Sequence, residues 1–83
     1  MGNQLRIAYD KEADVLDVSL GEPRAAVSRE VEDDLFLRFD LGTDEMVGFC
    51  LINFSRWFHN AGDFKVLPIV ADLALSDTLR DRE

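Results

Sequence analysis

The sequence has little of what side-chain catalysis or nucleic-acid binding requires. Its 83 residues include one histidine, His59, and one cysteine, Cys50. A two-histidine zinc site, a histidine pair for acid and base chemistry, and an internal disulfide are therefore not available. Only nine Lys and Arg residues stand against 17 Asp and Glu residues, for a net charge of -8. Because nucleic acids are bound through clustered Lys and Arg, this balance argues against a nucleic-acid partner.

The chain also lacks long apolar runs. The longest uncharged stretch, Met46 to Ser55, is far shorter than the roughly 18 residues that a membrane span requires. The first residues do not resemble a signal peptide, because Arg6 interrupts them and no long apolar run follows. Cys50, within an apolar stretch, is typical of a small buried side chain in a reducing compartment. We therefore expect a cytoplasmic protein without a membrane partner.

What the chain does have is apolar side chains, which make up 47% of its residues and include six Phe and one Trp. A chain of this length has room for a single domain spanning residues 1–83, whose core is thin. A small core combined with many apolar side chains favours self-association. We expect a homo-oligomer, with a dimer as the simplest form.

Apolar and polar residues alternate with a period of two, which predicts β-strands with one buried face. Acidic or glycine-bearing turns separate the segments. The third segment is the weakest and is expected at a sheet edge, whereas the nearly continuous apolar run of the last is typical of a central strand. The predicted strands are Leu5 to Tyr9, Leu16 to Leu20, Ala25 to Val31, Leu35 to Phe39 and Met46 to Phe54.

A short helix is expected after the last strand. Phe54, Trp57 and Phe58 fall at helical spacing, and Asn53 or Ser55 could cap its first turn. These aromatic residues, with Phe36, are the candidate interaction residues; core packing is the alternative interpretation. Residues 66–80 fit a strand and a helix about equally, and we favour a strand followed by a turn of helix.

Three acidic residues at alternating positions, Asp10, Glu12 and Asp14, are the candidate metal ligands of a metal-assisted hydrolase. The calcium-loop pattern fails here, because Val15 stands at its glycine position and Gly21 at its glutamate position. Acidic residues in a tight turn more often bind local backbone amides, which favours a structural role. No cofactor is expected. A Cys50–His59 nucleophile and base pair is disfavoured, because no activating carboxylate or oxyanion loop is indicated.

Two stretches resemble the small bacterial and archaeal family called domain of unknown function 2283. Tyr9 to Leu16 is similar to its opening signature, and Val47 to Asn53 to its second. The resemblance implies a compact β-rich protein without an assigned activity, and some members lie beside toxin-like proteins. Three positions depart from the family pattern: Cys50 replaces a usual glutamate, Asp17 a usual aromatic residue, and Arg38 a usual acidic residue. The resemblance therefore transfers no carboxylate site to this chain.

Together these observations predict an α+β domain. It would be a small curved antiparallel β-meander of about five strands, with a short aromatic helix and a C-terminal strand or helix packing on one face. The expected function is that of a non-catalytic protein-interaction module that self-associates. The alternatives are an antitoxin-like acidic protein that neutralises a basic toxin-like partner, and the metal-assisted hydrolase.

Overall fold

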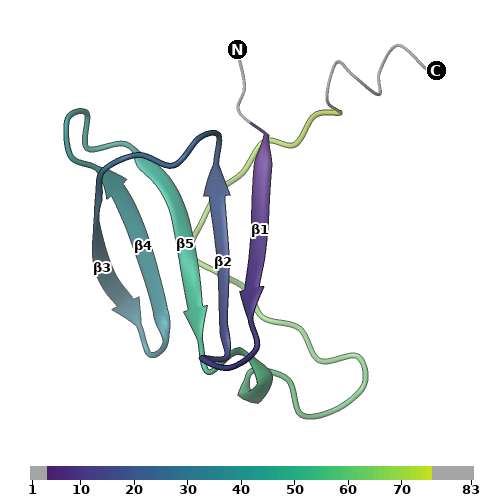
Figure 1. The fold of residues 1–83 in the computed structure, drawn as a ribbon. Helices are drawn as coiled ribbons and strands as arrows, with labels where there is room; N and C mark the ends of the chain where they lie inside the picture. The colour runs from purple at the N-terminus through teal and green to yellow at the C-terminus, as the bar shows by residue number, and fades with distance from the viewer. Residues whose placement is uncertain (1–3, 76–83) are drawn as a thin grey trace.

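The computed structural model describes residues 4–75, which form a five-stranded antiparallel sheet (Figure 1). The alternation seen in the sequence becomes strands at nearly the predicted positions. The strands are β1 (Leu5–Asp10), β2 (Val15–Leu20), β3 (Ala26–Glu32), β4 (Leu35–Asp40) and β5 (Met46–Ile52), followed by the short 3-10 helix η1 (Phe54–Arg56).

The strand order is β1-β2-β5-β4-β3, so β5 pairs with both β2 and β4. A hairpin, β1–β2, and a three-stranded meander, β3–β4–β5, are thus joined along the β2–β5 ladder. The connection of residues 21–25 runs from β2 past the ends of β5 and β4 to the far edge, where β3 begins (Figure 1). The prediction of β3 at an edge and β5 at the centre is confirmed, and the single consecutive meander is corrected by this order.

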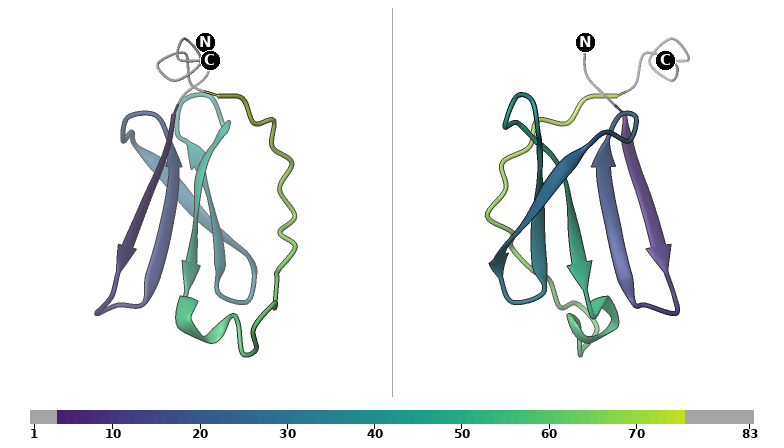
Figure 2. Two further views of the ribbon diagram at one scale, coloured as in Figure 1. Left: turned by 90° about the vertical axis from the view of Figure 1, so that its right-hand side faces the viewer. Right: turned by 60° about the vertical axis from the view of Figure 1, so that its left-hand side comes forward.

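The two faces of the sheet differ in cover. On what we call the core face, Leu35, Leu37 and Leu51 form the buried cluster. The C-terminal segment 57–75, which we call the strap, lies over this face (Figure 2) and adds Leu67 and Ile69 to the cluster. The other face, which we call the open face, has no second layer from the described residues (Figure 2).

Gly48 allows β5 to lie close to β2. A Cβ atom at this position would stand 2.6 Å from the Val18 carbonyl oxygen, a contact that real Cβ atoms do not make. Glycine in a strand often marks such a close backbone approach. The glycine in the middle of an otherwise apolar strand is therefore explained by the β2–β5 pairing.

The predicted α+β class is wrong, because the described residues contain no helix beyond the three-residue η1, and the fold is mostly β. Neither predicted cap forms, because Asn53 has a left-handed backbone with φ of 55° and no capping hydrogen bond, and the Ser55 hydroxyl donates to Asp14. Residues 66–75 are neither strand nor helix. The expected turn of helix beyond them lies outside the described residues.

No helix among residues 4–75 has the length and apolar character needed to cross a membrane.

Candidate functional site

The β1 edge of the sheet exposes a row of apolar side chains. Leu5, Ile7 and Tyr9 alternate along β1 and point to the core face, in register with Leu20, Val18 and Leu16 of β2. The row is nevertheless exposed, by 52% at Leu5, 69% at Ile7 and 44% at Tyr9. Sheet edges carry unpaired backbone groups that can pair with another strand. The β1 edge thus offers a backbone ladder and an apolar row together.

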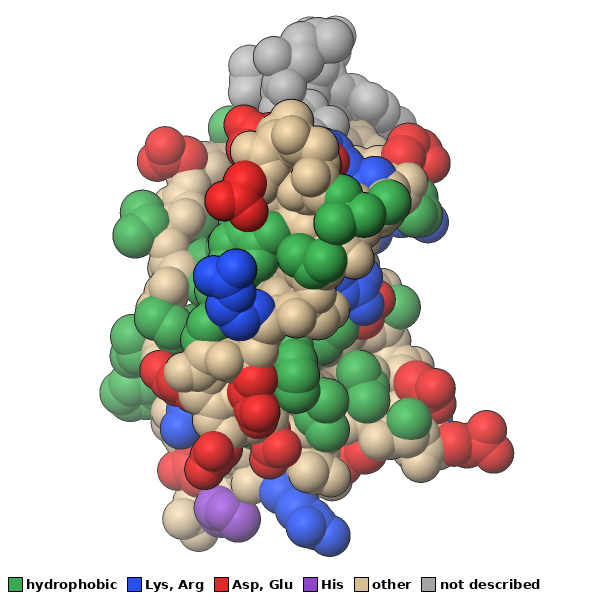
Figure 3. All heavy atoms as spheres, turned by 90° about the vertical axis from the view of Figure 1, so that its left-hand side faces the viewer, with side chains coloured by type: hydrophobic (Ala, Val, Ile, Leu, Met, Phe, Trp, Pro, Cys, Tyr) green, Lys and Arg blue, Asp and Glu red, His purple; other side chains and the backbone are tan. Residues whose placement is uncertain are grey.

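The opposite edge, β3, is protected. Its pairing with β4 shifts between Glu30 and Glu32, where Val31 is the extra residue of a β-bulge. Arg29, Glu30 and Glu32 also place charges along this strand, and Arg29 lies over the Phe39 ring at 5.2 Å. Figure 3 looks at this side of the molecule, where charged side chains of both signs interrupt the apolar ones. Bulges and charges of this kind hinder edge-to-edge pairing.

The strap adds further exposed apolar surface. While Leu67 and Ile69 face the sheet, four other apolar side chains of the strap point away from it: Phe64, Val66, Val70 and Leu73. Residues 64–74 make one backbone–backbone hydrogen bond with described residues, and it lies within the segment, from Ile69 N to Leu67 O at 2.7 Å. The strap is therefore held on the sheet mainly by side chains, Trp57 at its start and Leu67 and Ile69 further along.

The acidic residues of the first signature hold the β1–β2 turn. One oxygen of Asp10, Oδ1, accepts hydrogen bonds from the backbone N–H groups of Glu12 and Ala13, at 3.0 and 3.1 Å. The Glu12 side chain makes no hydrogen bond or ion pair with the described residues. Asp10 thus forms the predicted Asx-type turn, which leaves one of its oxygens turned away from Glu12 and Ala13.

Asp14 ties this turn to the end of β5. Its carboxylate accepts hydrogen bonds from the Tyr9 hydroxyl at 2.7 Å, the Ser55 hydroxyl at 2.6 Å and the Ser55 N–H at 3.0 Å. The Ser55 hydroxyl and then the Tyr9 hydroxyl lower the pKa of Asp14 below its ordinary value. The same hydrogen bond to Asp14 raises the pKa of Tyr9. Because Asp14 belongs to the first signature and Ser55 follows the second, this contact joins the two.

The predicted interaction residues lie on both faces of the sheet. Phe54 and Trp57 pack against the core cluster, and the Trp57 Nε1–H donates to the Ile52 carbonyl at 2.9 Å. Phe58 stacks edge-on against Phe54, with ring centroids 5.9 Å apart, and remains partly exposed. Phe36 lies opposite Cys50 on the open face. The structure therefore brings together Phe54, Trp57 and Phe58 and separates Phe36 from them.

Cys50 sits in a polar contact at the centre of the open face. Its thiol donates to Asp17 Oδ1 at 3.3 Å and accepts from Arg38 Nη2 at 3.1 Å, and the same nitrogen contacts Asp17 Oδ2 at 3.1 Å. Burial raises the pKa of the Cys50 thiol, the hydrogen bond to Asp17 adds to this, and the Arg38 charge opposes it. Reactive cysteines have a lowered pKa, so this thiol has the properties of a structural side chain.

His59 and Cys50 are not brought together. Cys50 lies within β5, whereas His59 lies in the loop beyond η1, where its backbone N–H donates to Asp63 Oδ2 at 2.8 Å. His59 lines a shallow hollow with Asp33, Asp34, Arg56, Trp57 and Lys65. Among residues 4–75, no three or more His, Cys, Asp or Glu side chains are grouped as a metal site would require.

Sequence reasoning identified the apolar alternation of β1 but not its exposure. The period of two shows which side chains share a face, and it does not show whether another layer covers that face. One signal was available. Arg29 and Glu30 mark β3 as a protected edge, whereas β1 carries only Arg6 and the terminal Asp10 as charges.

A comparison with protein-family models matches residues 6–55, more than half of the chain, to the family described as Protein of unknown function (DUF2283). No curated protein and no solved structure matches the chain. The matched residues run from β1 to η1 and include both signature stretches. Asp17, Arg38 and Cys50, which the resemblance described above sets apart, contact one another on the open face. The chain belongs to the DUF2283 family.

Proposed function

We propose that this protein is an interaction module whose first partner is a second copy of itself, bound through the β1 edge. The observation that carries the proposal is the exposed apolar row of Leu5, Ile7 and Tyr9 on a strand that has no bulge and keeps an unbroken register with β2. A strand of this kind pairs readily with another strand, and a two-fold axis lets the same edge serve both copies.

The sequence of β1 is self-complementary in one register. Antiparallel pairing centred on Ile7 places Ile7 opposite the partner's Ile7 and Leu5 opposite the partner's Tyr9. Residues that pair directly lie on the same face of a sheet, so this register continues the apolar face of one copy into the other. Arg6 then lies opposite the partner's Ala8, and no like charges oppose each other. A register shifted by one residue would place apolar side chains opposite polar ones.

The strap lies on the same side of the sheet as the β1 row (Figure 2). Val66, Val70 and Leu73 of the strap are exposed. Two copies joined at β1 would bring their core faces into one continuous surface. The exposed apolar side chains of β1 and of the strap would then lie on one side of the dimer rather than form separate patches.

Sedimentation velocity over a concentration series tests the proposal. The wild-type chain should sediment as a dimer at micromolar concentration. Ile7→Lys should weaken the dimer by about 30-fold or more, because a charge replaces a central apolar side chain, an effect of roughly 2 kcal/mol. Added salt should strengthen the wild-type dimer, because two chains of net charge -8 repel each other less when screened.

Val27→Lys is the matched control. Val27 lies on the other edge strand, points to the same face and is 44% exposed, so the substitution makes the same chemical change at a protected edge. The dimer of Val27→Lys should have the same dissociation constant as the wild-type dimer. A wild-type monomer throughout the series, or equal weakening by both substitutions, would refute association through β1.

A second candidate is binding of a basic protein partner, as an acidic antitoxin-like protein would do. The β1–β2 and β3–β4 turns lie at the same end of the sheet (Figure 1), and both carry exposed acidic residues. This end would attract a basic surface. Salt distinguishes the two candidates, because capture of a basic partner should weaken as salt rises. For either role we place the protein in the cytoplasm, where the free Cys50 thiol stays reduced.

A further inference from the structure

A cavity of about 270 Å³ lies over the open face, at the end where residues 21–25 cross from β2 toward β3. Small side chains line its base, namely Ala8, Ala26 and Val47. Three guanidinium groups line it as well, from Arg6 of β1, Arg24 of the crossing connection and Arg38 of β4. Three of the nine Lys and Arg residues of an acidic chain thus meet at one cavity.

The strand order explains why these arginines converge. Arg6 pairs with Ser19, Ser19 with Gly48, and Gly48 with Arg38, so one row crosses four strands of the open face. The two residues between the arginines are the smallest in the row, which leaves space between the two long side chains. The connection of residues 21–25 then adds Arg24 from above. This grouping depends on β5 lying between β2 and β4, so it is not visible in the linear sequence.

Each arginine lies near one carboxylate, and these contacts leave most of the guanidinium N–H donors unused. Arg38 Nη2 contacts Asp17 at 3.1 Å, and Arg6 Nη1 lies 3.9 Å from an almost fully exposed Glu22. Among described residues, these pairs use one terminal nitrogen of each guanidinium. A guanidinium has five N–H donors, so the remaining donors can bind further acceptors.

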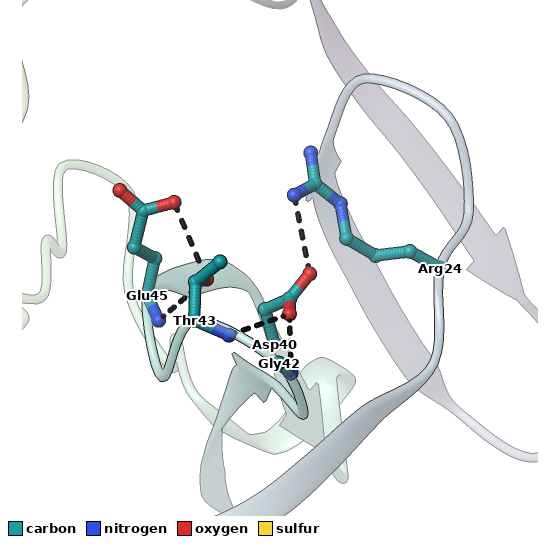
Figure 4. Close-up of polar contacts among 5 residues, drawn as sticks. All are labelled: Arg24, Asp40, Gly42, Thr43 and Glu45. Carbon is teal, nitrogen blue, oxygen red and sulfur yellow. Dashed lines mark hydrogen bonds and ion pairs between the residues drawn. The ribbon is translucent and has the colours of Figure 1, made fainter.

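The Arg24 contact shows the same arrangement (Figure 4). Asp40 is held by its own turn, because its Oδ1 accepts from the N–H groups of Gly42 and Thr43 at 2.7 and 3.0 Å. These backbone hydrogen bonds, first from Thr43 and then from Gly42, lower the pKa of Asp40. Its other oxygen accepts from Arg24 Nη1 at 3.3 Å. Asp40 is therefore a fixed anchor that orients Arg24 from the side of the β4–β5 loop.

We propose that this cavity binds a small organic ligand through an oxyanion group, a phosphate monoester or a carboxylate, held between the guanidiniums of Arg6, Arg24 and Arg38. Arginine forms paired, charge-assisted hydrogen bonds with both kinds of oxyanion. The apolar base of the cavity accepts the body of the ligand. Asp17 and Glu22 in the lining, and Asp40 beside Arg24, offset the three guanidinium charges, so the anion is held by N–H donors rather than by a net positive charge. The site borders the β1 edge, because Arg6, Ile7 and Ala8 of β1 also line it. Arg24 lies outside β1, so Arg24→Gln tests the site separately from the association.

Titration of the ¹⁵N-labelled full chain, followed by amide chemical shifts, tests the site. The probes are phenyl phosphate, benzoate and the neutral benzamide, at constant ionic strength. We expect saturable shifts at Ala8, Ser19 and Ala26 with one or both anions and none with benzamide. Saturation by phenyl phosphate alone identifies the phosphate, and saturation by benzoate alone identifies the carboxylate. Equal shifts with benzamide, or no saturable shifts with any probe, would overturn the proposal.

Substitutions locate the binding. Arg24→Gln and Arg6→Gln each remove an exposed guanidinium. Each should lower the affinity for the anion by about fivefold, the effect of one lost hydrogen bond of roughly 1 kcal/mol. Arg56→Gln makes the same charge change in η1, at the other end of the sheet, and should leave the affinity within about twofold. The amide spectra show directly whether each variant is folded. Equal weakening by all three variants would mean nonspecific attraction and would also overturn the proposal.

Discussion

The two edges of this sheet are built in opposite ways. At one edge, β3 carries a bulge and the charged residues Arg29, Glu30 and Glu32. At the other edge, β1 pairs with β2 in unbroken register and exposes Leu5, Ile7 and Tyr9. Under the proposed function, this difference blocks association at one edge and permits it at the other. A sheet with one permissive edge forms a closed two-fold dimer, whereas two permissive edges would let copies add without limit.

The comparison between the two edges is tested most strongly by removing the features that protect the β3 edge. Deleting Val31 removes the extra residue of the bulge, and combining the deletion with Arg29→Thr and Glu32→Thr removes two charges and adds residues with high strand propensity. The variant should form species larger than a dimer, because both edges can then pair. Size-exclusion chromatography with light scattering measures the mass.

The matched control keeps the charges and deletes Val31 alone, which should give a smaller increase in mass. If the triple variant keeps the mass of the wild type, the bulge and charges of β3 do not protect this edge, and the comparison between the edges fails.

The turns that hold the two edge strands should also differ. Asp14, at the β1–β2 turn, accepts hydrogen bonds from Tyr9 and Ser55, whereas Glu30 accepts one from the Asp34 N–H at 3.3 Å. Asp14→Asn should lower the free energy of unfolding at neutral pH more than Glu30→Gln does, because it weakens several hydrogen bonds to a charged acceptor. Urea unfolding of both variants measures the difference.

The effect of Asp14 should depend on pH. Its pKa is lower in the folded chain than its ordinary value of 3.8, so its charge stabilises the fold above that value. This stabilisation is lost as the pH falls from the ordinary value toward the lowered one. The difference in unfolding free energy between wild type and Asp14→Asn should therefore be largest at neutral pH and should decrease below pH 3.8. If this difference in unfolding free energy does not change with pH, the charge of Asp14 does not stabilise the turn.

Much of the local structure could be predicted from the sequence, and the class of the fold could not. Alternating apolar residues located the five strands, and the charges of β3 marked it as an edge. The prediction of a helix was wrong, because the spacing of Phe54, Trp57 and Phe58 fits a 3-10 turn that leads into the strap equally well. The strap itself was ambiguous, since Pro68 lacks an N–H donor and the apolar residues around it fit both periods.

The candidate sites depended on pairings between distant parts of the chain. The turn role of Asp10 was expected from local chemistry, but the contact of Asp14 with Ser55 spans 41 residues and was not foreseen. Likewise, Arg6 and Arg38 meet at one cavity only because β5 separates β2 from β4. Periodicity identifies faces, and the order of strands decides which faces meet and which stay uncovered.

Hydrogen exchange at two protein concentrations tests the central claim most directly, because it reports on each edge strand separately. On moving from the low micromolar to the high micromolar range, the amides of β1 that point away from β2 should exchange more slowly, while the edge amides of β3 should exchange at an unchanged rate. Equal behaviour of the two strands, or slowing at β3 alone, would contradict association through β1.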